Sequence, residues 1–139
     1  MNAETILNAA ISVLKQKGRH LGDYECDGKV CVLGAMGVAA GLTPDYWSEV
    51  EDADLDDLEP VDDVLLDAGR LLVHVIAPHR ADYDHLHPAA VIDLVGRWHD
   101  GPTERAADQV RFLDPPSDTA VFEALAEAVR LAEQAGASA

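Results

Sequence analysis

The sequence predicts a mainly α-helical protein, a compact bundle of five or six helices with one short β-hairpin at about residues 24–31. Apolar residues recur at helical spacing, only 5% of residues are aromatic, and the strongest hairpin signal is one Asp-Gly pair. A core built from Leu, Val, Ile and Ala suits packed helices better than a β-sandwich. The 139 residues fit one domain. We expect a single domain over 1–139 with an acidic insertion at about 45–63.

Apolar residues at helical spacing define the expected helices. The clearest repeat spans 64–76, follows Asp62 or Asp63 as the N-cap and stops before Pro78. Other segments with a helical pattern are 3–17, 31–40, 88–100, 103–113 and 118–135. Because the connections between them are short, a bundle is the expected arrangement.

The segment 24–41 contains the expected hairpin and the most apolar helix. Asp27-Gly28 predicts a two-residue type I′ turn, since both central residues need positive φ. Cys31 then opens a helix that is apolar on every side and is expected to be buried. Gly34 and Gly37 lower its helix propensity, which indicates that another helix approaches closely at positions where a Cβ would clash. The expected structural core includes Cys31, Gly34, Gly37, Leu72, Val75 and Trp98.

Charge is the strongest compositional signal. The formal net charge is −16, and no Lys or Arg occurs between Val30 and Gly69. A protein of this charge repels nucleic acid and anionic lipid, so the expected partner is a protein with a basic surface. The alternative is a solvated loop in a generally acidic proteome. The expected interaction residues are Asp45, Glu49, Glu51, Asp52, Asp54, Asp56 and Asp57.

Cys31 supports a different class of protein, a small thiol enzyme. It stands where a strand meets a helix N-terminus, and the helix dipole lowers the pKa of a thiol at that place. His74 or His99 would supply the base that such a nucleophile needs. The competing interpretation is a buried, unreactive cysteine, because no local signature of a thiol-enzyme family accompanies it. The sequence therefore assigns no catalytic residue.

The histidine-rich connection suggests a metal site as a further alternative. His79, His85 and His87 lie near two aspartates, and imidazoles with a carboxylate can hold zinc. Their spacing matches no standard motif, and the competing interpretation is a solvated loop in which His87 caps the following helix. We expect no metal and no cofactor.

The sequence also indicates a compartment. No apolar run approaches the roughly 18 residues of a membrane span, and the first residues carry no basic segment of a signal peptide. Cys26 and Cys31 are too few for a disulfide scaffold. These features predict a cytoplasmic protein with reduced thiols and no membrane association.

Two short motifs and the N-terminal helix resemble a known family. The motifs are Gly28-x-Val30-Cys31-x-x-Gly34-Ala35 and Trp98-x-Asp100 followed by Thr103. They are similar to those of an uncharacterised family, a domain of unknown function, of small proteins from actinobacteria and their bacteriophages. This chain has His99 where the family pattern has Asn, and its acidic middle is longer. The resemblance implies a fold and a phage or actinobacterial source, and it implies no activity.

These observations predict a small acidic, non-enzymatic interaction protein of phage or actinobacterial origin. It is expected to bind a host or cellular protein through its acidic surface. The thiol enzyme and the metal-binding protein remain the alternatives. The position of a histidine relative to Cys31, and the exposure of the Cys31 sulfur, would distinguish the interaction protein from the thiol enzyme.

Overall fold

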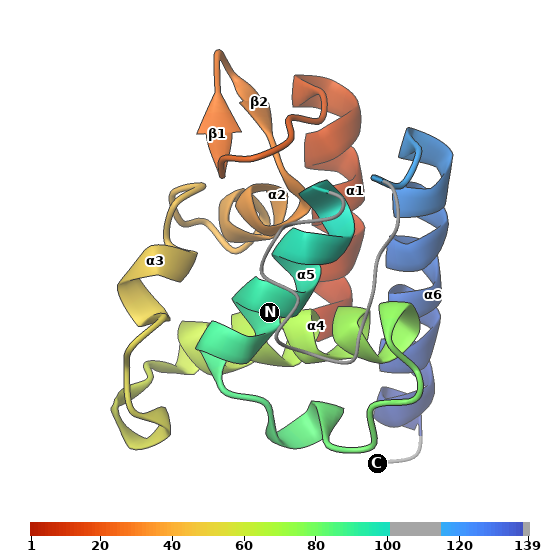
Figure 1. Ribbon diagram of the computed structural model, residues 1–139. Helices are drawn as coiled ribbons and strands as arrows, with labels where there is room; N and C mark the ends of the chain where they lie inside the picture. The colour runs from red at the N-terminus through yellow and green to blue at the C-terminus, as the bar shows by residue number, and fades with distance from the viewer. Residues whose placement is uncertain (101–114, 138–139) are drawn as a thin grey trace.

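The computed structural model describes residues 1–100 and 115–137. These residues form a mainly helical bundle with one short antiparallel hairpin, as the sequence predicts (Figure 1). The helices are α1 (Ala3–Lys17), α2 (Val32–Ala39), α3 (Trp47–Val50), α4 (Pro60–Ile76), α5 (Pro88–Asp100) and α6 (Asp118–Ala137). The strands are β1 (Glu25–Cys26) and β2 (Lys29–Val30), and two 3-10 turns, η1 (Leu55–Asp57) and η2 (Tyr83–His85), lie in connections. The helix expected at 103–113 falls outside the described residues.

Helices α1 and α6 lie side by side and antiparallel, and α4 packs against both (Figure 1). Asn2 caps α1 by accepting a hydrogen bond from the Thr5 backbone N–H at 2.9 Å. Gly18 ends this helix at φ +87°, as the sequence predicts. Arg19 then joins the end of α1 to the start of α6, because its Nε donates to Asp118 Oδ1 at 2.7 Å.

The hairpin has the predicted turn and register. Asp27 and Gly28 both have positive φ, and Cys26 pairs with Lys29. The backbone N–H of Cys31 donates to the Tyr24 carbonyl at 3.2 Å, so the ribbon leads directly into α2. Both cysteines are free.

Helix α2 lies at the centre of the core. A Cβ on Gly34 would stand 2.2 Å from the Tyr24 carbonyl oxygen, and one on Gly37 would stand 2.7 Å from the Thr43 carbonyl oxygen. The two glycines therefore permit a close approach, but the approaching groups are the backbones of neighbouring connections and not the other helices that the sequence predicted.

The start of helix α4 differs from expectation. Helix α4 begins at Pro60 with Glu59 as its N-cap, and Asp62 lies at the third helical position. The carboxylate of Asp62 accepts from the Glu59 backbone N–H at 3.0 Å, so it stabilises the first turn from inside the helix.

The predicted core residues divide into buried and half-buried groups. Cys31, Gly34, Gly37 and Leu72 are buried, whereas Val75 and Trp98 are half-buried at the edge of the core. The fully buried indole is that of Trp47, whose Nε1 donates to the Leu33 carbonyl at 3.0 Å.

Candidate functional site

A cavity of about 210 Å³ opens where the segment before the hairpin meets α2 and the last turns of α5. Three chain segments build it, and the segment from α5 lies far from the other two in the sequence. We call this hollow the Cys31 pocket. Its lining residues are Gly22, Asp23, Tyr24, Cys31, Leu33, Ile92, Val95, Gly96, His99 and Asp100.

Cys31 is held as a neutral, buried thiol in this pocket. The residue is 9% exposed, and its Sγ accepts a hydrogen bond from the Gly34 backbone N–H at 3.3 Å, which caps α2. Burial raises the pKa of the Cys31 thiol to about 11, and the backbone hydrogen bonds offset only part of that effect. Removal from water therefore outweighs the helix dipole at this site.

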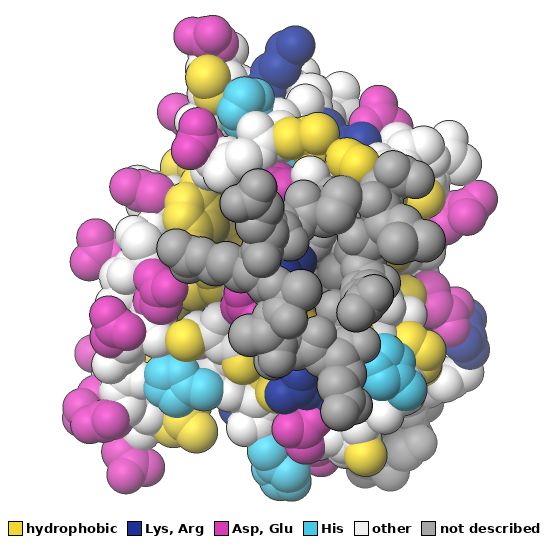
Figure 2. Space-filling model, in the orientation of Figure 1, with side chains coloured by type: hydrophobic (Ala, Val, Ile, Leu, Met, Phe, Trp, Pro, Cys, Tyr) yellow, Lys and Arg dark blue, Asp and Glu magenta, His cyan; other side chains and the backbone are white. Residues whose placement is uncertain are grey.

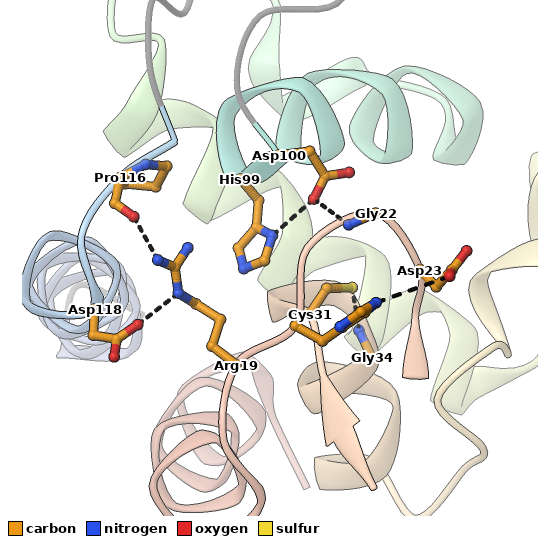
Figure 3. Close-up of polar contacts among 10 residues, drawn as sticks. Arg19, Gly22, Asp23, Cys31, Gly34, His99, Asp100, Pro116 and Asp118 are labelled. Carbon is orange, nitrogen blue, oxygen red and sulfur yellow. Dashed lines mark hydrogen bonds and ion pairs between the residues drawn. The ribbon is translucent and has the colours of Figure 1, made fainter. Parts of the chain in front are cut away.

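His99 lines the same pocket and is buried, with 2% exposure. Its Nδ1 lies 3.1 Å from Asp100 Oδ1, and its Nε2 has no hydrogen-bond partner among the residues described (Figure 3). With Asp100 ionised, Nδ1 is the ring nitrogen that donates to its carboxylate. In Figure 3 the ring stands between Asp100 and Arg19, and Nε2 faces away from Asp100.

Asp100 connects α5 to the segment that precedes the hairpin. Its Oδ1 also accepts a hydrogen bond from the Gly22 backbone N–H at 2.9 Å (Figure 3). Burial by itself raises the pKa of the Asp100 carboxyl, but the hydrogen bonds from His99 and Gly22 lower it on balance. The carboxylate is therefore ionised at neutral pH.

The pocket brings together two of the three residues considered for thiol chemistry. His99 has a carboxylate on one ring nitrogen, which is the arrangement that orients a general base. Within the described residues, however, no hydrogen bond joins His99 to Cys31, whose sulfur is bonded to Gly34 instead. His74 lies outside the pocket lining and stacks on Tyr83 with ring centroids 4.1 Å apart.

The acidic residues of 45–57 lie on a different part of the surface. All seven of the expected interaction residues are exposed, and in the described parts of the chain none of them forms an ion pair. Leu55 is exposed among them at 45%. Figure 2 shows Asp and Glu side chains gathered along the edge that carries α3 and η1. We call residues 45–57 the acidic surface.

The imidazoles of the histidine-rich connection do not lie together. His79 and His85 are exposed, and both ring nitrogens of His87 are engaged, Nε2 with the Ala53 carbonyl at 2.8 Å and Nδ1 with the Ala89 backbone N–H at 3.3 Å. His87 thus caps α5. Within residues 1–100 and 115–137, no group of three or more His, Cys, Asp or Glu side chains is placed to hold a metal ion.

Sequence reasoning missed the contribution of the segment 22–24 to the pocket. Asp23 and Tyr24 precede the hairpin without any motif of their own. Their place in the site follows from the long-range hydrogen bond between Gly22 and Asp100. Cys31 and Asp100, in contrast, belong to the two short motifs on which the family resemblance rests.

The fold and the pocket define a small acidic helical protein with one buried thiol next to an imidazole–carboxylate pair. Residues 1–115 match the sequence model of a family described as a family of unknown function, DUF6197, and the chain belongs to this family. Comparison with curated proteins found no match, and comparison with solved structures found none either. Among the described helices, none is both long enough and apolar enough to span a membrane.

Proposed function

We propose that this chain is a non-enzymatic binding protein whose acidic surface engages a basic surface on a host or cellular protein. The observation that supports this proposal most directly is that the seven acidic residues of this surface are exposed and form no ion pair within the described structure. Where other acids of the chain lie near an arginine they pair with it, as Asp118 does with Arg19 and Asp93 with Arg97. The acidic surface has no such partner in the described structure, so its charge is available to a second molecule.

Exposed Leu55 adds an apolar contact to this surface. Acidic residues at the rim of an interface steer a basic partner and set the association rate, while apolar groups contribute more of the affinity. Leu55 is 45% exposed and lies between Asp54 and Asp56, so this short turn combines an apolar contact with acidic side chains. The proposal therefore centres on η1 and its neighbours.

A capture experiment with a matched control tests the proposal. The full chain is immobilised and lysate of the source organism is passed over it at low and at moderate salt. We expect a basic protein that is retained at low salt and released as salt screens the contact. The variant Asp52→Asn/Asp54→Asn/Asp57→Asn is expected to lose this protein. The variant Glu25→Gln/Glu123→Gln/Glu133→Gln, which removes the same charge from exposed residues elsewhere, is expected to keep it.

The proposal fails if no protein is captured in either condition, or if both triple variants lose the captured protein equally. The second result would mean that only the total charge matters. A protein retained regardless of salt and of the acidic-surface variant would point to a different face of the molecule.

Thiol chemistry is a second candidate, supported by the shared pocket of Cys31 and His99 and by the carboxylate on His99. It requires Cys31 to react as a thiolate, and burial opposes this. Iodoacetamide labelling of the folded chain at pH 7 separates the candidates, with half-buried Cys26 as the internal reference. A reactive Cys31 whose labelling slows in His99→Ala supports the enzyme, whereas a Cys31 that reacts only after unfolding is a core residue.

A further inference from the structure

The Cys31 pocket has an apolar wall and an acidic side. Leu33 of α2 and two residues of α5, Ile92 and Val95, supply the apolar wall, and the acidic residues of the lining are Asp23 and Asp100. Its lining, as far as the structure describes it, contains no Lys or Arg. The cavity of about 210 Å³ has room for roughly seven water molecules at about 30 Å³ each. An occupant is therefore a small molecule with a short apolar body.

Both carboxylates keep capacity to accept hydrogen bonds. Asp100 uses Oδ1 for Gly22 and His99, and its Oδ2 has no hydrogen-bond partner among the described residues. The side chain of Asp23 is 76% exposed, and His20 Nε2 stands 3.9 Å from it, beyond hydrogen-bond distance. A cation with several N–H donors would satisfy oxygens that the described residues leave open.

The surroundings of the pocket carry the same sign of charge. The pKa of Tyr24 is raised to about 12, first by burial and then by Glu51, Cys31 and Asp45, so the phenol stays protonated. Glu51 and Asp45 thus extend the negative field to the pocket's edge. Two imidazoles face these carboxylates: the Nδ1 of His99 lies 3.1 Å from Asp100 Oδ1, and the Nε2 of His20 lies 3.9 Å from Asp23 Oδ2.

We propose that the Cys31 pocket binds a small primary amine with a short aliphatic body. Its alkyl part lies against Leu33, Ile92 and Val95, and its ammonium group donates to Asp23 and Asp100. An anion of the same size is repelled, and a neutral alcohol gains the apolar contact without the charge-assisted hydrogen bonds. This proposal does not depend on the binding function assigned to the acidic surface.

Calorimetric titration of the full chain with n-pentylamine, 1-pentanol and pentanoate at pH 8 tests it. At this pH the amine is charged and pentanoate is ionised. We expect saturable one-to-one binding of pentylamine, and binding of pentanol and pentanoate that is weaker by about tenfold or more. Amide shifts in NMR spectra are expected at Gly22, Cys31 and Gly96.

Three variants locate the binding. Asp23→Asn removes an exposed carboxylate of the pocket and is expected to weaken pentylamine about tenfold. Gly96→Leu places a side chain where a Cβ meets no atom within 4 Å, and it is expected to fill the pocket and abolish binding. Asp57→Asn, on the acidic surface, is the matched control and is expected to leave binding unchanged. Non-saturable uptake of pentylamine, equal binding of pentanoate, or equal loss in Asp57→Asn overturns the proposal.

Discussion

Gly34 is the residue at which the packing of α2 is tightest. A Cβ there would lie 2.2 Å from the Tyr24 carbonyl oxygen, and backbone cannot move aside as a flexible side chain can. The same carbonyl accepts the Cys31 N–H at 3.2 Å, so displacing it disturbs the start of α2. We expect Gly34→Ala to lower the free energy of unfolding by about 1–3 kcal/mol or more, as overpacked cores do.

Gly96→Ala is the matched control for this substitution. Gly96 also lies within a helix, but its added Cβ meets no atom within 4 Å. Alanine is the better helix former by roughly 1 kcal/mol, so this variant is expected to be as stable as the parent or more stable. Urea denaturation of both variants gives the comparison, and equal destabilisation of the two would contradict the packing argument.

The buried thiol of Cys31 makes a pH-dependent contribution to stability. Its pKa is about 11 in the folded chain against an ordinary value of 9.0. Between these values the unfolded chain releases the proton while the folded chain retains it, so the free energy of unfolding falls as the pH rises from about 9 to 11. The loss is on the order of 2–3 kcal/mol.

Cys31→Ser isolates this contribution. Serine keeps an N-cap acceptor for the Gly34 N–H but does not titrate in this range. Urea denaturation at pH 8 and pH 10.5 is expected to show a smaller loss of stability in the variant than in the parent. Tyr46 also has a raised pKa, of about 12, and acts equally in both proteins. The pKa of Tyr24 is raised mainly by burial and only in part by Cys31, so most of its effect is common to both proteins. Identical pH profiles would show that the thiol is not shielded from water.

At the scale of the element, the first turn of α4 depends on one buried carboxylate. Asp62 is 6% exposed and accepts two hydrogen bonds, from the Tyr46 hydroxyl at 2.6 Å and from the Glu59 backbone N–H at 3.0 Å. Asp62→Ala leaves both donors without their acceptor, and we expect the free energy of unfolding to fall by about 1–3 kcal/mol.

The neighbouring acid provides the comparison for Asp62. Asp63 is exposed in the same turn, so Asp63→Ala loses only a favourable interaction with the helix dipole, at most about 1 kcal/mol. A double-mutant cycle with Tyr46→Phe measures how much the Tyr46–Asp62 hydrogen bond contributes to the free energy of unfolding. If the two alanine variants unfold at the same urea concentration, the first turn of α4 does not depend on the Asp62 carboxylate.

The elements also show how far local sequence patterns reach. The repeat over 64–76 and the Asp27-Gly28 turn predicted α4 and the hairpin correctly, because periodicity and turn conformation are local properties. The start of α4 was misplaced because Pro60 and Glu59 can open a helix just as well as Asp62 can. Local patterns could not predict the pocket, because it depends on a hydrogen bond between the Gly22 N–H and Asp100, which lies 78 positions later in the chain.

Burial of side chains near the C-terminal end of α5 depends on how the helix is rotated against its neighbours. Apolar periodicity favours Trp98 as the inward residue, yet His99 is the buried one and Trp98 is half-buried. The hydrogen bond to Asp100 stabilises the imidazole at this place, which no count of apolar residues reveals. Sequence could therefore identify Cys31 and His99 as candidates but could not show that they share a cavity.

At the scale of the whole molecule, a net charge of −16 on 139 residues makes self-repulsion a property of the folded state. The acidic surface concentrates that repulsion, because its seven carboxylates have no ion-pair partner in the part of the chain that the structure describes. Added salt shortens the Debye length from about 30 Å at 10 mM to about 8 Å at 150 mM, so stability is expected to rise over this range.

Charge removal from the acidic surface should reproduce the effect of salt. We expect Asp52→Asn/Asp54→Asn/Asp57→Asn to raise the free energy of unfolding by a few tenths of a kcal/mol at 10 mM salt and to lose that gain at 1 M, where the Debye length is about 3 Å. Asp118→Asn, which removes the partner of Arg19, is expected to act in the opposite direction. Urea is the suitable denaturant because it adds no ions. A triple variant that is less stable than the parent at low salt would mean that these carboxylates stabilise the fold. Loss of a binding partner by that variant would then report unfolding and not the loss of an interaction surface.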